Sequence, residues 1–260
     1  MLRKIVFSSL LILLISCASS PLERRQVVLY SDAEMRRQGE QAYRQIQQKT
    51  PISSSVRDTD YVQCVADHVI AALNDEDRIS IVWEVTVFDQ DQANAFALPG
   101  GKIGVYNGLF DTAVNQDQLA AVIAHEIGHV LGDHSNERAS QSAIRNVGVA
   151  AAQILGASST AMQVLNSATQ YGVFLPFSRT QESEADSIGV LLMARAGFDP
   201  ASSITLWENM SVGAGPSPPE LLSTHPSPSS RIEDLENRLS EATPLFQAAR
   251  ESGLSPDCSR

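Results

Sequence analysis

Apolar residues recur every three or four positions between residues 116 and 131, and this spacing predicts an amphipathic helix with one face toward a core. Residues 79–88 alternate and are rich in Ile and Val, which predicts a strand. A shorter extended segment is expected at 93–98, followed by a Pro-Gly-Gly turn and a strand at 102–106. This order indicates a mainly helical α+β fold with a small β-sheet beside helix 116–131. Capping residues and apolar periodicity predict further helices over residues 31–50, 60–73, 180–196, 199–210 and 231–241.

Two long segments interrupt this pattern. Residues 140–170 are rich in Ala, Ser and Gly with scattered apolar residues, which predicts a helical hairpin packed on the body. A surface that contacts lipid or unfolded chains is the alternative interpretation. Arg145, Asn146 and Gln153 argue against a transmembrane span. Residues 211–229 are rich in proline and are expected to form a loop.

The N-terminus has the pattern of a targeting segment. Arg3 and Lys4 precede an apolar run at residues 5–15, which is too short to span a bilayer but fits a signal peptide. The following Leu14-Ile15-Ser16-Cys17 resembles the lipobox of bacterial lipoproteins, in which the cysteine is lipidated. A plain secretory signal is the alternative. Ala18, rather than aspartate, resembles the pattern for sorting to the outer membrane.

Charge and cysteines narrow the choice of partners. The formal charge of the 260-residue chain is −11, and it becomes −13 when residues 1–16 are removed. Such an acidic chain is a poor binder of polyanions, so nucleic acid is not expected as a partner. Cys64 and Cys258 would form a disulfide in an oxidising compartment if their Cα atoms lie close together, which the sequence leaves open.

The predicted helix 116–131 contains the sequence His125-Glu126-Ile127-Gly128-His129. Residues four apart share a helical face, so both imidazoles can bind one metal ion. Glu126 projects from a neighbouring part of that face, where it can take a proton from a water on the metal. The alternative is a solvated surface helix with no metal.

A catalytic zinc site usually takes a third protein ligand from elsewhere, and the helix after residue 180 offers candidates. Glu182 and Asp186 are four apart and share a face, whereas Glu184 points away from both. One carboxylate can bind the metal while the other orients a ligand imidazole. The spacing does not decide which of the two does so, and an acidic helix start without a metal is the alternative.

Four motifs in the same order resemble those of a known family. They are Asn94-Ala95-Phe96-Ala97 with Pro99-Gly100-Gly101; His125 to His129; Ser178-Arg179 with Glu182 to Asp186; and Ser223-Thr224-His225-Pro226 with Arg231. Over residues 30–240 the chain resembles the gluzincin endopeptidases that include HtpX and the CAAX prenyl protease. Within them it is most similar to the bacterial lipoprotein protease LoiP and the protease domain of BepA.

The resemblance implies a zincin-like fold and a role for each matching residue. His125, His129 and Glu182 would bind Zn²⁺, and Glu126 would act as general base. Asp186 would contact one of these ligands without binding the metal itself. His225 would either steady the oxyanion or cap the metal in a resting state, unless it is an ordinary loop histidine. Asn94, Ala95 and Phe96 would form an edge strand with which a substrate backbone pairs, unless this segment is an ordinary strand and turn. His134 matches no motif and is expected to face solvent.

The resemblance also implies an organisation and a function. We expect a signal peptide at 1–16, a lipidated tether at 17–30, one metalloprotease domain at 31–242 and a C-terminal tail at 243–260. The expected function is hydrolysis of unfolded or misassembled envelope proteins at the periplasmic face of the bacterial outer membrane. Lipidated Cys17 would provide the membrane anchor, and the outer-membrane assembly machinery is an expected partner. The alternative is a periplasmic lipoprotein chaperone with a structural or latent zinc site.

Overall fold

The computed structural model describes residues 17–154, 178–212, 225 and 230–260. In chain order its elements are β1 (Cys17–Ser19), β2 (Arg25–Val27), α1 (Asp32–Lys49), α2 (Val56–Ala71), α3 (Asp75–Ser80), β3 (Glu84–Phe88), β4 (Ala95–Leu98), β5 (Lys102–Tyr106), the 3-10 helix η1 (Asn107–Asp111), α4 (Gln116–Leu131), α5 (His134–Ile154), α7 (Arg179–Arg195), α8 (Ser202–Val212) and α10 (Arg231–Glu251).

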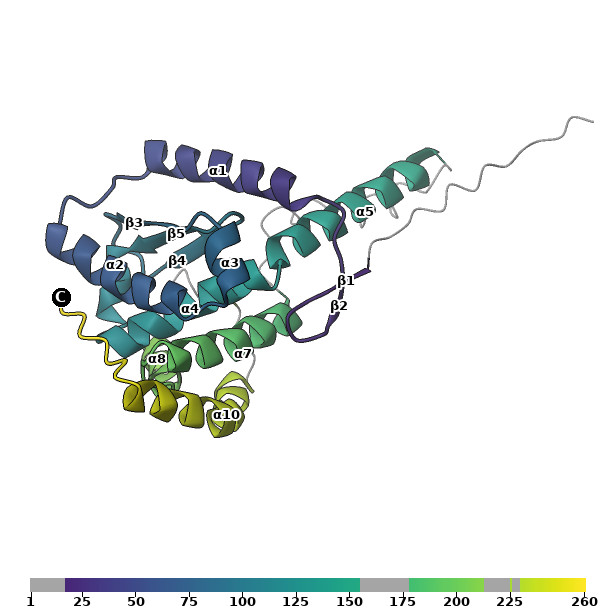
Figure 1. Ribbon diagram of the computed structural model, residues 1–260. Helices are drawn as coiled ribbons and strands as arrows, with labels where there is room; N and C mark the ends of the chain where they lie inside the picture. Colours follow the sequence, from purple (N-terminus) through teal and green to yellow (C-terminus); the bar gives the residue numbers. More distant parts are fainter. Residues whose placement is uncertain (1–16, 155–177, 213–224, 226–229) are drawn as a thin grey trace, which may run out of the picture.

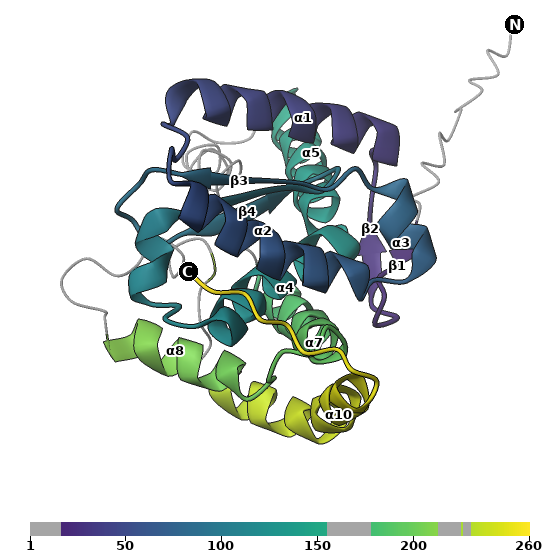
Figure 2. The same cartoon turned by 60° about the vertical axis from the view of Figure 1, so that its left-hand side comes forward.

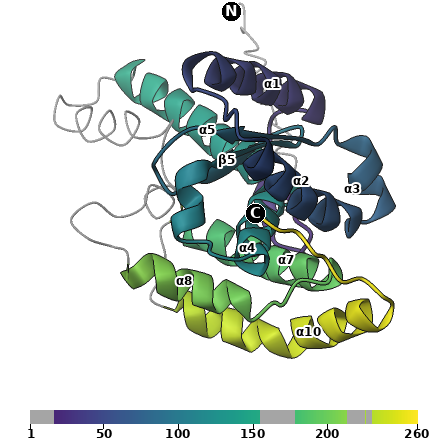
Figure 3. The same ribbon diagram turned by 90° about the vertical axis from the view of Figure 1, so that its left-hand side faces the viewer.

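The elements are stacked in layers around the three-stranded sheet. Figure 1 shows α1 on one face of the sheet and α2 and α4 on the other. Beyond α4 lies α7, and Figures 2 and 3 show α8 and α10 covering the side of α7 that faces away from the sheet. Strand β5 is central, parallel to β3 and antiparallel to β4, so β4 is an edge strand. This architecture confirms the predicted mainly helical α+β fold with its small sheet beside the metal-motif helix.

Helix α4 forms where the apolar spacing predicts it, but it is buried on nearly every side. Asn115 caps its start by accepting a hydrogen bond from the backbone N–H of Gln118. All residues from Gln118 to His129 are buried, because the sheet packs on one side of α4 and α7 on the other. Polar side chains of α4 are therefore held in a low-dielectric interior, where each needs a partner.

Helices α4 and α7 approach each other closely at two glycines. A Cβ atom on Gly128 would lie 2.7 Å from the carbonyl oxygen of Ala185, and one on Gly189 would lie 2.9 Å from the backbone nitrogen of His125. Any larger side chain at either position would force the two helices apart. Because α4 carries the histidine motif and α7 carries the acidic motif, this contact brings both sets of candidate ligands together.

Three predicted element boundaries are wrong for local reasons. The strand expected at 79–88 is shorter, since Asn74 caps the short helix α3 and β3 begins only at Glu84. Helix α2 begins at Val56 rather than at residue 60, because Ser55 caps it. Helix α7 begins after Ser178, where Ser178 and Gln181 form a reciprocal capping box, and not after Thr180.

The two ends of the described chain differ from expectation. Residues 17–30 were expected to form a tether, but β1 and β2 pair as an antiparallel hairpin with Cys17 opposite Val27. Helix α10 was expected to end at Glu241, but it continues through Pro244 to Glu251, so part of the predicted tail is helical. The predicted signal peptide and most of the proline-rich segment lie outside the described residues, as does the second half of the predicted helical hairpin.

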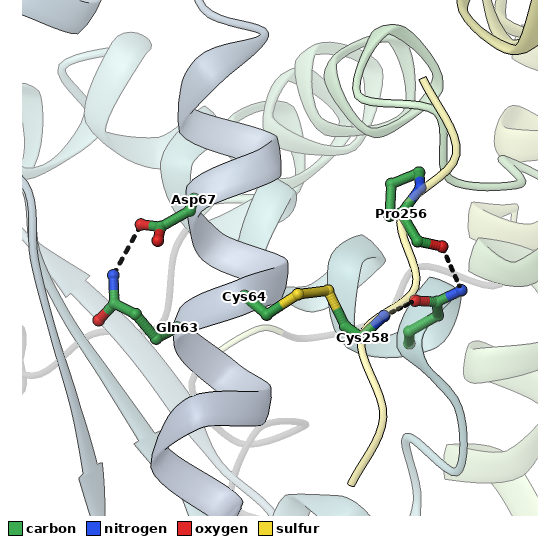
Figure 4. The surroundings of a disulfide bond; sticks show 6 residues. Gln63, Cys64, Asp67, Pro256 and Cys258 are labelled. Atoms are coloured by element: carbon green, nitrogen blue, oxygen red, sulfur yellow. Dashed lines mark hydrogen bonds between the residues drawn. A yellow bond between two sulfur atoms is a disulfide. The ribbon is translucent and has the colours of Figure 1, made fainter. Parts of the chain in front are cut away.

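The possible disulfide is formed. Cys64 on α2 is bonded to Cys258 near the C-terminus, with a Cα–Cα distance of 5.8 Å (Figure 4). The side chain of Gln116 holds the same tail, because it accepts a hydrogen bond from the N–H of Cys258 and donates one to the carbonyl of Pro256. In the part of the chain that the structure describes, no helix has the length and apolar character needed to cross a bilayer.

Candidate metal centre

Four buried side chains from three parts of the chain converge at one point. His125 and His129 come from α4, Glu182 from the first turn of α7, and His225 from the segment between α8 and α10. The Nε2 atoms of His125 and His129 lie 3.0 Å apart. The Glu182 carboxylate lies 3.5 Å from the first of these atoms and 3.3 Å from the second. Nδ1 of His225 lies 3.3 Å from Nε2 of His125 and 3.0 Å from Glu182.

These distances fit a tetrahedral zinc site. Zinc bonds of about 2.0–2.1 Å to nitrogen and oxygen place tetrahedral ligand atoms about 3.3–3.4 Å apart. The observed separations of 3.0–3.5 Å bracket that value. The donor set, three imidazoles and one carboxylate, is also one that zinc accepts. The residues present therefore fit the metal that the motif predicts.

The ring of His125 is held from behind by a carboxylate. Its Nδ1 lies 2.9 Å from Oδ1 of Asp186, one helical turn beyond Glu182 on α7. Arg231 at the start of α10 joins the two carboxylates, donating to Asp186 at 2.6 Å and to Glu182 at 3.0 Å. In the neutral ring, with Nδ1–H donated to Asp186, Nε2 of His125 is left with its lone pair toward the cluster. This geometry decides between the two acidic candidates: Glu182 faces the cluster and Asp186 stands behind it.

Expectation and structure disagree at His134. This residue was expected to face solvent, but it is fully buried and its Nδ1 lies 2.8 Å from Nδ1 of His129. Helix α4 ends at Leu131, and Asp133 has a positive φ of 50°, so the chain reverses and returns the next side chain to the helix it has just left. The other ring nitrogen of His134 lies 3.2 Å from Glu184. The sequence signal for this contact is a histidine five residues after the motif. Helical periodicity does not predict where its side chain points, because α4 has already ended.

Electrostatics differ between the two motif histidines. Burial by itself lowers the pKa of His125, but its hydrogen bonds to Asp186 and Glu182 outweigh this effect and raise that pKa to about 9. For His129 burial prevails and holds the pKa well below its ordinary value. Burial would raise the pKa of Glu182, yet hydrogen bonds from three histidines keep it far below its usual range. A buried carboxylate surrounded by imidazoles in this way is suited to hold a cation among them.

Glu126 is positioned between the cluster and the edge strand. Its Oε2 accepts a hydrogen bond of 3.1 Å from the backbone N–H of Ala97 in β4. Its Oε1 lies 3.3 Å from Nε2 of His225 and is buried without a hydrogen bond among the described residues. Burial raises the pKa of Glu126 above its ordinary value. One oxygen is thus fixed by the strand, and the other lies beside His225 at the edge of the cluster.

In the segment predicted to bind substrate, the backbone groups of successive residues point alternately toward β5 and away from it. The N–H of Tyr106 donates to the carbonyl of Asn94, and Phe96 lies opposite Gly104, so the backbones of Asn94 and Phe96 face β5. The ring of Phe96 packs against other aromatic rings of the sheet. The backbone groups of Ala95 and Ala97 face away from β5, and Ala97 makes the contact with Glu126. At the outer edge of β4 the backbone groups presented are therefore those of Ala95 and Ala97, and not those of Asn94 and Phe96.

A layered α+β fold whose histidine-motif helix meets an acidic helix defines a zincin-type metallopeptidase. Comparison with known proteins agrees, because the model of Peptidase family M48 matches residues 57–239. The chain belongs to this family, which confirms the predicted metalloendopeptidase class at the level of the family.

Two kinds of relative are similar to the chain. It is 40% identical over 185 residues to Mitochondrial metalloendopeptidase OMA1 of Schizosaccharomyces pombe, covering 70% of this chain and 53% of that protein. It is 30% identical over 224 residues to the Beta-barrel assembly-enhancing protease of Escherichia coli (strain K12), covering 82% of this chain and 45% of that protein. The chain thus spans about half the length of these relatives.

Proposed function

We propose that this protein is a zinc-dependent endopeptidase in which His125, His129 and Glu182 hold the metal. The observation that carries the proposal is the convergence of these three side chains at ligand distances from two helices. When bound, zinc supplies a lowered pKa for water and polarisation of a peptide carbonyl.

Glu126 is the proposed general base. Its Oε1, the oxygen that the strand does not hold, accepts a proton from the attacking water and then delivers it to the leaving nitrogen of the scissile peptide bond. Its raised pKa favours this role, because a carboxylate that is too acidic holds an abstracted proton poorly. The hydrogen bond from Ala97 keeps the carboxylate in one rotamer, so the reacting oxygen needs little reorganisation.

The proposed substrate is an extended, unfolded polypeptide that adds to the edge of β4. Ala95 and Ala97 direct backbone groups away from β5, as strand addition requires, although the N–H of Ala97 is already donated to Glu126 and leaves its carbonyl and the groups of Ala95 for a substrate. The side-chain oxygen of Asn94 is buried without a hydrogen bond among the described residues, which supports a polar contact made only with substrate. Pairing of this kind needs an exposed backbone, so misassembled or unfolded proteins are the proposed clients.

For location and partners we propose the periplasmic face of the bacterial outer membrane, with Cys17 as lipid anchor. The lipobox-like sequence carries this proposal, and a relative named for assembly of β-barrels supports both the location and contact with the outer-membrane assembly machinery. Other relatives are named as mitochondrial, so the proposed lipid anchor needs a direct test. Replacing Cys17 by serine should abolish acylation, measured by labelling with palmitate, and should move the protein out of the membrane fraction. The likeness to LoiP remains a prediction.

One observation favours a second candidate function, a lipoprotein chaperone with a structural or latent zinc site. Nδ1 of His225 completes a set of four protein ligand atoms, and structural zinc sites are closed in this way. Replacing His225 by alanine separates the possibilities. Faster cleavage identifies a residue that caps the metal at rest, lost cleavage with zinc retained identifies a catalytic role, and lost zinc identifies a structural site.

The proposed enzyme is tested by Glu126→Gln. The variant should retain zinc at wild-type stoichiometry, because Glu126 is not among the proposed ligands, while digestion of casein falls by about 10²- to 10⁴-fold. Glu40→Gln, at a half-exposed carboxylate on α1, is the matched control and should digest casein normally. Undiminished cleavage by Glu126→Gln would refute the assignment of the base.

A further inference from the structure

Behind His129 lies a chain of buried polar contacts that the mechanism does not use. Nδ1 of His129 faces Nδ1 of His134 at 2.8 Å, and Nε2 of His134 lies 3.2 Å from Oε2 of Glu184. Both histidines and Glu184 are buried. This chain parallels the contact of His125 with Asp186, but it approaches the cluster from the other side and adds an imidazole between the ligand and the carboxylate.

The outer end of the chain is fixed by the N-terminal hairpin. Arg24, in the turn between β1 and β2, donates through Nε to Oε2 of Glu184 at 2.6 Å. Its two terminal nitrogens donate to the carboxylate of Glu137 at 2.9 and 2.8 Å. The hydroxyl of Ser20 hydrogen-bonds to the other oxygen of Glu184. Two donors of the hairpin therefore hold the Glu184 carboxylate, one on each oxygen.

These contacts determine where the ring protons lie. Glu184 is ion-paired with Arg24, and an ionised carboxylate acts only as an acceptor, so Nε2 of His134 must carry a proton and donate it to Glu184. Nδ1 of a neutral His134 is then an acceptor, and the facing Nδ1 of His129 must be the donor. Nε2 of His129 is consequently unprotonated and directs its lone pair at the proposed metal position, 3.0 Å from Nε2 of His125.

We propose that His134 and Glu184, held by Arg24, are positioning residues that fix the tautomer and ring orientation of His129 for metal binding. This inference rests on the proposed ligand role of His129. It makes the β1–β2 hairpin part of the support of the metal centre, although none of its residues touches the cluster. Outer partners of this kind typically change metal affinity by about 10- to 100-fold when removed.

A matched pair of substitutions tests His134. Asparagine and leucine have nearly the same shape, but only asparagine places an acceptor oxygen close to the position of the ring Nδ1. His134→Asn should bind zinc within a fewfold of wild type, whereas His134→Leu should lose about 10- to 100-fold in affinity, measured by competition with a chromophoric chelator. Equal affinities in the two variants, whether both normal or both weakened, would overturn the inference.

A second pair tests the outer end and does not depend on the fold tolerating a change at His134. Glu184→Gln and Glu137→Gln both break an ion pair with Arg24, but Glu184 also lies within hydrogen-bond distance of His134. Glu184→Gln should therefore weaken zinc binding more than Glu137→Gln, while the melting temperatures of the two metal-free variants fall by similar amounts. An equal loss of zinc affinity in both would show that docking of the hairpin, and not the contact of Glu184 with His134, is responsible.

Two reference measurements keep this inference separate from the proposed function. Wild-type protein should bind one zinc ion, and His129→Ala should not retain it. Failure of either result would refute the proposed ligand set. If both results are obtained but His134→Leu and Glu184→Gln bind zinc normally, the positioning role of His134 and Glu184 alone is refuted.

Discussion

Replacing Gly128 by alanine should loosen the metal centre without touching any proposed ligand. The new Cβ atom would lie 2.7 Å from the carbonyl oxygen of Ala185, whereas ordinary contacts begin at 3.4 Å, so α7 must retreat by about 0.7 Å. Glu182 is three residues before Ala185 on the same helix and would move with it. Zinc sites tolerate only about 0.2 Å in ligand distance, so this displacement exceeds what the site can absorb.

The expected result is a zinc affinity reduced at least tenfold and a free energy of unfolding lowered by about 1–3 kcal/mol, measured by chelator competition and by urea denaturation. Gly39→Ala provides the control. Its Cβ would lie 2.0 Å from the carbonyl oxygen of Pro99, between α1 and the end of β4, so it adds comparable or greater overpacking away from the proposed ligands. That variant should lose stability and keep its zinc affinity. A folded Gly128→Ala protein with wild-type zinc affinity would refute the reasoning.

Two further predictions concern stability. Reducing the Cys64–Cys258 bond, or replacing both residues by serine, should lower the free energy of unfolding by about 2–4 kcal/mol, since 194 residues separate the two cysteines; unchanged urea midpoints with and without reductant would contradict this. Burial raises the pKa of Asp133 to about 6, so the folded state favours its protonated form and loses stability as the pH rises from about 4 through 6. Asp133→Asn, which suits the positive φ, should therefore gain about 1 kcal/mol at pH 7 after allowance for partial exposure, and nothing at pH 4. An equal gain at both pH values would show that charge is not the cause.

The sequence was sufficient for the central helix and the separation of the acidic candidates into two positions. Both depend on helical geometry within a few residues, which is the same in any fold: His125 and His129 share a face, and so do Glu182 and Asp186. Asparagine and serine caps likewise mark helix starts, although the predicted elements start α7 at residue 180 rather than after Ser178 and omit the short helix that Asn74 caps. What the sequence alone could not decide was which carboxylate faces the histidine cluster, because that depends on how α7 lies against α4.

The remaining contacts link residues far apart in the sequence. His134 meets Glu184 across 50 residues, and Glu184 meets Arg24 across 160. No periodic pattern in the sequence predicts either contact. The β1–β2 hairpin is not predictable from the sequence because its strands are only three residues long, too short to show alternation. Polar contacts with α5 and α7 hold the hairpin in place, and the β-propensity of its own residues does not.

The bond between Cys64 and Cys258 encloses α4, α7 and His225 within one covalent ring. A single cut of the backbone anywhere between these cysteines leaves both pieces attached while the bond is oxidised, and only a second cut within the ring would release a fragment. Such nicks would be invisible on a gel run without thiol and would appear as two bands once thiol is added.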